Sequence, residues 1–189
     1  MSVSEPIPQE DFRAAVEPTV RVLTQLADIA QNAPIEFGHL PAAGSIAMAD
    51  IEAESQQFDG MSDWKEALTD THSLGNISLF AASDFVRSYA ALFDRERPPV
   101  FGHLVLSRPA MEACVTSMWL NDPSIEPIER IQRGLSERLY SALELQRMGQ
   151  TREKGKEVEA QILEVAKSYG WAIEGRKVGG VRRPWIPPS

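Results

Sequence analysis

Two opposite charges lie inside an apolar, helix-like segment, and they are the first candidates for chemistry in this sequence. The segment "LSRPAMEACVTSMWLNDP" runs from Leu106 to Pro123 and carries Arg108 and Glu112, four residues apart. At about 100° per residue, Arg108 falls inside an apolar arc and Glu112 falls at its edge. A charge that faces a core must be paired or must line a cavity, because burying it alone is costly. The arc comprises Leu104, Met111, Val115, Met118 and Trp119.

Two interpretations of this pair stay open. In the first, Arg108 and Glu112 belong to an interhelical ion-pair network, with Asp84 or Arg130 as a partner, that fixes how the helix packs. In the second, the same groups line a polar pocket that binds a small ligand. Surface stabilisation explains the pair poorly, because arginine before glutamate is the less favourable i,i+4 order. Pro109 either kinks the helix or starts a new one, and in the second case the pair need not be buried.

A second pattern with chemical potential is "RPPVFGH", which places Arg97 and His103 with five residues between them. This spacing resembles the R-x(4–6)-H motif of the HEPN family of helical-bundle ribonucleases. The resemblance implies that Arg97 and His103 help to cleave RNA, usually across a dimer. The two prolines depart from the family's pattern, whose motif normally lies at a helix. The alternative is a loop arginine followed by a histidine at a helix start.

The sequence contains no stronger signature of catalysis or metal binding. GxSxG, HExxH, GxxxxGK[ST] and GxGxxG motifs are absent. His39, His72 and His103 lie in separate segments, and no Cys, His or carboxylate spacing indicates a metal site. Cys114 sits in an apolar segment with no basic residue beside it, which favours an inert buried thiol. We therefore expect neither a metal nor a cofactor.

Composition and charge narrow the classes of protein. The chain has 189 residues, of which 43% are hydrophobic and 24% charged, so it can bury a sizeable core. The net charge of -8 is uneven: -10 over residues 1–75, -2 over 76–175 and +4 over 176–189. An acidic body disfavours broad contact with nucleic acid or an anionic membrane. The single cysteine, the lack of a signal-peptide pattern and the lack of a bilayer-length apolar run predict a cytoplasmic location.

The elements that position these residues are predicted to be helices, because apolar periodicity of the helical type covers most of the chain and no strand alternation appears. We expect an all-α, antiparallel bundle of five to six helices in a single domain over residues 1–175. The Pro- and Gly-rich residues 176–189 predict a flexible, irregular basic tail. The expected helices cover 9–32, 45–58, 100–121, 124–149 and 151–169. Between the second and third of these, Ser62 marks a helix start, and a stronger helix runs from Gly75 or Asn76 to Arg95. Gly170 is expected to be the C′ residue of the last helix.

The helix expected over 124–149 has the clearest amphipathic pattern. Its apolar stripe comprises Ile128, Ile131, Leu135, Leu139 and Ala142, and its charged residues, Arg130 and Arg133 among them, fall on the other face. Arg130 is also one of the two candidate partners of the Arg108 network.

The part of the chain from Asp70 onward resembles a bacterial family of uncharacterised all-helical proteins. The shared pattern is R-x3-E, then W-L, then D-P, then R-x2-R. In this sequence Arg108 and Glu112 match the first part, residues 119–120 the second, residues 122–123 the third, and Arg130 and Arg133 the fourth. Pro109 departs from the pattern, which usually has an apolar residue there. The family carries no known activity, so the resemblance implies the fold.

These observations favour a regulatory or protein-interaction module without catalytic activity that binds itself or another protein. A HEPN-like ribonuclease and a small-ligand-binding bundle are the alternatives. The tail mixes cations with aromatic rings, and three roles are open for it. It can stack on single-stranded nucleic acid, it can dock on an acidic protein surface, or it can be a solvated tail that its tryptophans hold in place. Its residues are Arg176, Lys177, Arg182 and Arg183, with Trp171 and Trp185.

Overall fold

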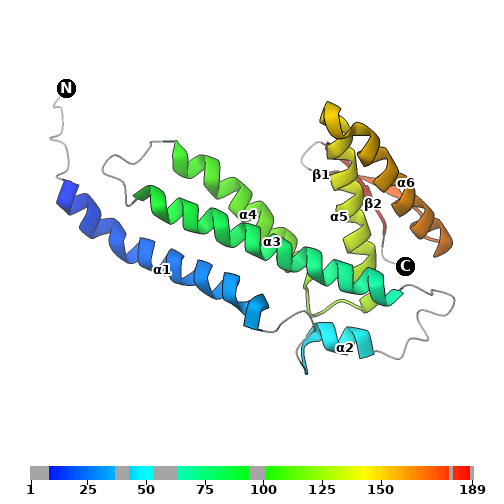
Figure 1. The fold of residues 1–189 in the computed structure, drawn as a ribbon, viewed down its shortest axis with the longest axis horizontal. Coiled ribbons are helices and arrows are strands. Elements are labelled where there is room, and N and C mark those ends of the chain that lie inside the picture. The colour runs from blue at the N-terminus through cyan, green and yellow to red at the C-terminus, as the bar shows by residue number, and fades with distance from the viewer. Residues whose placement is uncertain (1–8, 37–42, 53–63, 94–100, 179–180, 188–189) are drawn as a thin grey trace. The chain divides into compact units, whose positions relative to one another are not determined.

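The computed structural model describes residues 9–36, 43–52, 64–93, 101–178 and 181–187 (Figure 1). These residues form six α-helices, one short 3-10 helix and a two-stranded hairpin, which confirms the all-α bundle predicted for the body of the chain. Contacts divide the chain into two compact units: unit 1 comprises residues 1–40 and 76–118, and unit 2 comprises 41–75 and 119–189. A single domain over 1–175 stays a prediction.

Unit 1 is built from α1 (Gln9–Glu36), the second half of α3 (Trp64–Phe93) and nearly all of α4 (Gly102–Leu120). Figure 1 shows α3 running antiparallel to α1 and α4. An ion pair joins α1 to α3, with Arg87 Nη2 2.6 Å from Asp28 Oδ1. Side chains at a helix contact set how closely the helices approach, and the fully buried side chains among the described residues of unit 1 are small. They are Ala27, Ala82, Ser83, Ala90, Ala110 and Ser117.

The structure corrects one helix boundary. The sequence predicted a helix start at Ser62 and another at Gly75 or Asn76, whereas α3 runs without interruption from Trp64 to Phe93. Gly75 is needed for close packing and not for a helix start, because a Cβ at this position would lie 2.5 Å from Nδ2 of Asn121. The glycine marks a close approach of the chain after α4, and it does not begin a helix.

Unit 2 combines α2 (Ile46–Glu52), the first turns of α3, α5 (Pro127–Arg147) and α6 (Arg152–Ser168), with a 3-10 turn between the last two. The helix expected over 45–58 is confirmed as far as Glu52, and its remainder lies outside the described residues. The expected C′ glycine is confirmed, because Gly170 has φ 71° just beyond α6. The core of unit 2 consists of Leu68, Ile131, Leu135, Leu139, Ile162, Ala166 and Ile186.

The prediction of an irregular tail was wrong. Strand β1 (Glu174–Val178) pairs antiparallel with β2 (Val181–Trp185), and Gly175 lies opposite Pro184. Ile186, directly after β2, is completely buried in the core of unit 2, and its backbone N–H donates to Ser136 Oγ at 2.9 Å. Both strands of this two-stranded sheet are edge strands, where a proline is tolerated. The hairpin is anchored by Ile186, which lies outside it, so the Pro- and Gly-rich composition was misleading.

Candidate functional sites

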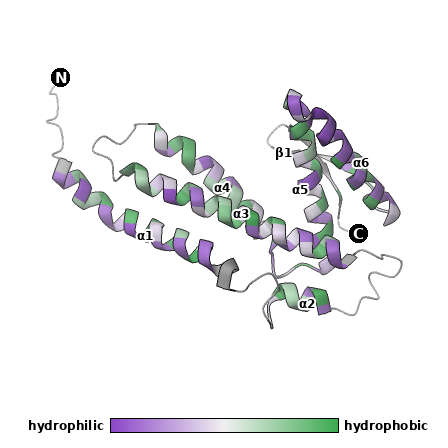
Figure 2. Ribbon diagram, viewed as in Figure 1, coloured by the Kyte–Doolittle hydropathy of each residue, from purple (hydrophilic) through white to green (hydrophobic). Residues whose placement is uncertain are grey.

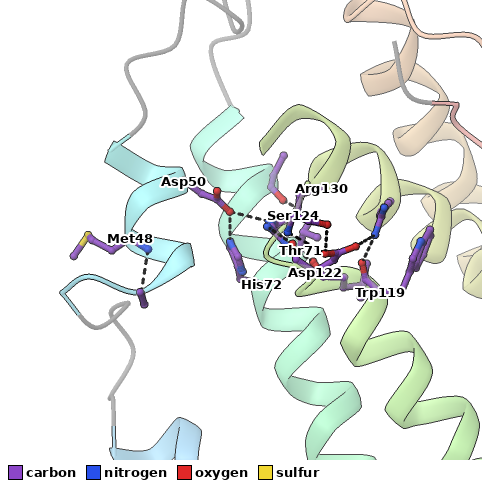
Figure 3. Close-up of polar contacts among 12 residues, drawn as sticks. Met48, Asp50, Thr71, His72, Trp119, Asp122, Ser124 and Arg130 are labelled. Carbon is purple, nitrogen blue, oxygen red and sulfur yellow. Dashed lines mark hydrogen bonds and ion pairs between the residues drawn. The ribbon is translucent and has the colours of Figure 1, made fainter. Parts of the chain in front are cut away.

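A buried arginine is the centre of the polar interior of unit 2. Arg130 on α5 is 0% exposed, and its Nε donates to Asp50 Oδ2 on α2 at 2.7 Å. Its Nη1 donates to Leu120 O at 2.5 Å and its Nη2 to Asp122 O at 2.8 Å (Figure 3). The same Asp50 oxygen lies 2.9 Å from His72 Nε2 on α3. Asp50, His72 and Arg130, named the Arg130 cluster here, therefore tie α2, α3, α5 and the chain after α4 together.

Burial lowers the pKa of His72 from its usual 6.5, and the positive charge of Arg130 acts in the same direction. The hydrogen bond with Asp50 opposes that shift without overcoming it. His72 is therefore neutral at pH 7. The Asp50 oxygen that faces His72 also accepts from Arg130 Nε, so the hydrogen bond at His72 requires the tautomer that carries its proton on Nε2.

A second arginine extends the same polar interior. Arg133 donates to Trp119 O at 2.7 Å and to Glu129 Oε1 at 2.7 Å, and its guanidinium lies 5.4 Å from the centre of the Trp119 ring. The Trp185 ring, at the end of β2, packs on Trp119 with 5.5 Å between centroids. Both arginines of the R-x2-R pattern thus bond to the segment from Trp119 to Asp122, and these contacts hold the chain after α4 against α5.

The donors of the Arg130 cluster are directed at protein acceptors. The guanidinium is fully buried and bonds through all three of its nitrogens, and a buried arginine satisfied in this way fixes geometry instead of binding a ligand. We conclude that the cluster positions four segments of unit 2. Sequence reasoning named Arg130 but placed it on the polar face of its helix and missed Asp50 and His72.

One sequence signal could have indicated the burial of Arg130. Gly134 lies one turn later on the same side of α5, and a Cβ there would overlap the side chain of Thr71 on α3. A glycine inside an otherwise regular helix indicates a close approach by another element. That approach is what covers Arg130, and it brings His72, the neighbour of Thr71, within reach.

The proposed polar core around Arg108 is contradicted by the structure. Arg108 Nε bonds to Glu112 Oε1 at 2.8 Å, and the two side chains are 83% and 65% exposed. Asp84 is exposed on α3, and Arg130 is bound to Asp50 instead. The residues of the arc do share one side of α4, but that side is exposed from Leu104 to Met118, and only Trp119 at its end is half-buried. α4 also continues through Pro109 without a break.

The exposed side of α4 carries large apolar side chains in a continuous row. Figure 2 shows α4 coloured mainly as hydrophobic. Its buried side carries the small residues Ala110 and Ser117, so the larger apolar surface faces outward. The row and its two charges, named the α4 face here, comprise Phe101 (72% exposed), Leu104 (58%), Val105 (68%), Arg108, Met111 (68%), Glu112, Val115 (63%) and Met118 (74%).

The pair predicted for ribonuclease chemistry cannot be assembled from the described residues. His103 lies half-buried in the first turn of α4, whereas Arg97 lies outside the described residues. HEPN-like RNA cleavage therefore stays a prediction. Cys114 is half-buried on α4 and is a free thiol. Within the described parts of the chain, no group of three or more His, Cys, Asp or Glu residues could hold a metal ion.

A cleft of about 450 Å³ lies in unit 2, away from every residue that the sequence named as a candidate ligand site. Arg138 on α5 bonds to Asp70 on α3 at 3.0 Å at this cleft. Thr71, Gly134 and Tyr169 also line it. Asp84, Arg108 and Glu112 do not line this cleft, and the small-ligand prediction around them stays a prediction.

Comparison with known proteins found no matching family model, no curated protein and no solved structure with significant similarity to this chain. The resemblances to the HEPN family and to the bacterial all-helical family stay predictions. None of the helices in the described ranges is long and apolar enough to cross a membrane.

Proposed function

We propose that this chain is a protein-interaction module whose binding surface is the α4 face of unit 1. The observation that supports the proposal is the row of six large apolar side chains along α4, each more than half exposed. Isolated apolar residues on a surface are ordinary, whereas a continuous row along one helix is typical of a site where another protein binds.

The packing of unit 1 explains why this surface is present. The fully buried side of α4 in unit 1 carries the small residues Ala110 and Ser117, whereas five of its large apolar residues are exposed. Each square ångström of apolar surface removed from water contributes about 25 cal/mol, so covering the row is favourable. A partner helix with an apolar face of its own fits a straight row at i, i+3, i+4 and i+7 spacing.

A regulatory role, a bacterial origin and a cytoplasmic location complete the proposal. They rest on the sequence: the single cysteine, the acidic body and the pattern shared with the bacterial all-helical family. In this proposal the Arg130 cluster keeps unit 2 folded and takes no part in binding. The α4 face alone supplies the contact with a partner.

Site-specific photocrosslinking in cells tests this proposal. A photoreactive amino acid at Val115, on the α4 face, should give discrete covalent adducts with a protein. The matched control is Leu163, an exposed apolar residue of α6 in unit 2, where we expect none. Adducts at neither position, or equal adducts at both, would contradict the proposal, because the α4 face would then show no preference for protein.

A further inference from the structure

The charges of the α4 face are arranged symmetrically about the middle of the helix. Arg108 and Glu112 are the two charged residues of the row, and each lies two positions from residue 110. Val105 and Val115 obey the same symmetry, because each lies five positions from residue 110, and further exposed apolar residues lie on either side of them: Phe101 and Leu104 before, Met118 after. Such a face is complementary to itself when it is turned end over end.

We infer that the occupant of the α4 face is a second copy of this chain, paired through antiparallel α4 helices; this inference rests on the proposed function above. In a two-fold dimer, residue i of one copy contacts residue j of the other and the reverse contact is made too. A two-fold axis at the level of residue 110 places Arg108 opposite the partner's Glu112, and the partner's Arg108 opposite Glu112.

The same register brings the apolar residues together. Val105 lies opposite Val115 of the partner, and Phe101 lies beside Met118 of the partner, so both ends of the row are covered. A parallel pairing would place Arg108 against Arg108 and Glu112 against Glu112, which is unfavourable because like charges repel. Charge complementarity therefore selects the antiparallel arrangement.

The exposed state of the Arg108–Glu112 pair is consistent with this arrangement. Within one copy the two groups bond at 2.8 Å while remaining 83% and 65% exposed, so most of their surface is free to meet a second pair. Four alternating charges at the centre of the interface then form a closed network. An exposed pair of this kind contributes little in one copy, and in the interface each charge faces an opposite charge, so neither is covered without a partner.

Charge reversal tests the inference with the purified full chain. Arg108→Glu gives a face with two negative charges, and Glu112→Arg gives one with two positive charges. Each variant alone should dimerise at least about tenfold more weakly than the wild type in sedimentation equilibrium. An equimolar mixture of the two should restore wild-type association as a heterodimer. The rescue cannot arise from helix repair, because neither variant regains its internal ion pair.

The control is Glu153→Lys, which disrupts an exposed ion pair with Lys156 on α6 of unit 2 and should leave association unchanged. Circular dichroism establishes that each variant keeps its helices. Single variants that dimerise like the wild type, or a mixture that stays monomeric, would overturn the inference. A monomeric wild type whose Val115 crosslinks to a different protein would overturn the second copy as occupant and leave the interaction module standing.

Discussion

The two units bury different kinds of side chain. Among the described residues, the fully buried ones of unit 1 are alanines and serines, such as Ala27, Ala82 and Ala110. Unit 2 buries leucines and isoleucines and also the charged Arg130. Among the described residues, ten of the fourteen exposed large apolar side chains belong to unit 1. They are Val22, Leu26, Ile29, Ile77, Phe101, Leu104, Val105, Met111, Val115 and Met118.

This difference indicates a division of roles. Unit 2 has a core of large apolar side chains, and its buried Arg130 is paired with Asp50 inside the unit. In unit 1 the fully buried described residues are small, and ten large apolar side chains are exposed, where a partner can cover them. We therefore expect substitutions in unit 2 to change folding, and substitutions on the α4 face to change association.

The largest expected effect is on the buried ion pair of unit 2. Arg130→Met leaves Asp50 buried beside a neutral histidine, and removing one partner of a buried pair costs about 3–5 kcal/mol in the free energy of unfolding. Arg87→Met is the matched change in unit 1, because Arg87 also bridges two helices but its pair with Asp28 is about half exposed. It should cost at most about 1 kcal/mol. Equal losses in urea denaturation would remove the distinction between the units.

Apolar truncation gives the next largest contrast. Leu139 is 2% exposed in the core of unit 2, so Leu139→Ala should lower the free energy of unfolding by about 2–5 kcal/mol. Val115→Ala on the α4 face should leave that free energy nearly unchanged in dilute protein and should weaken association instead. The free energy of unfolding and the strength of association are measured for both variants. A Val115 variant that unfolds as readily as the Leu139 variant would place Val115 in a core.

A glycine substitution tests the close approach that covers Arg130. Gly134→Ala would drive a Cβ into Thr71, and overpacking of this kind costs about 1–3 kcal/mol, although alanine is the better helix former. Gly149→Ala is the control, because nothing lies within 4 Å of a Cβ at that position. Thermal denaturation should show a lower Tm for the first variant alone. An unchanged Tm for Gly134→Ala would mean that α3 and α5 are farther apart than described.

The smallest expected effect is a dependence on pH. Burial holds the pKa of folded His72 below the usual 6.5 of the unfolded chain. As the pH falls below about 6.5, the unfolded chain takes up a proton that the folded protein resists, so stability falls; above that pH the full stability is present. His72→Gln should reduce this slope. If the variant and the wild type lose stability equally between pH 7 and pH 5, His72 is not the group responsible.

Much of the fold could be predicted because helices follow from local periodicity. The stripe of Ile131, Leu135 and Leu139 on α5 was recognised as apolar and is buried in the core. The hairpin was missed, because its strands depend on a distant anchor: Ile186 enters the core and bonds to Ser136, fifty positions earlier. Composition could not reveal such a contact.

The candidate site was harder to predict, because a helical arc does not say which side faces a neighbour. Arg108 was placed correctly on the apolar arc of α4, but the neighbours of α4 pack on its small residues and the arc is exposed. Arg130 was placed on a polar face, yet Asp50 reaches it from eighty residues away. Both errors arose because tertiary packing, and not local pattern, decides which face is covered.

Disulfide trapping between two copies tests the central claim most directly. Val105→Cys and Val115→Cys, each made with Cys114→Ser to remove the native thiol, are purified separately and then mixed under mild oxidation. The antiparallel α4 pairing predicts that a covalent dimer forms between the two variants, faster than either variant crosslinks to itself. Preferential 105–105 and 115–115 crosslinks, or no crosslink in the mixture, would contradict the account.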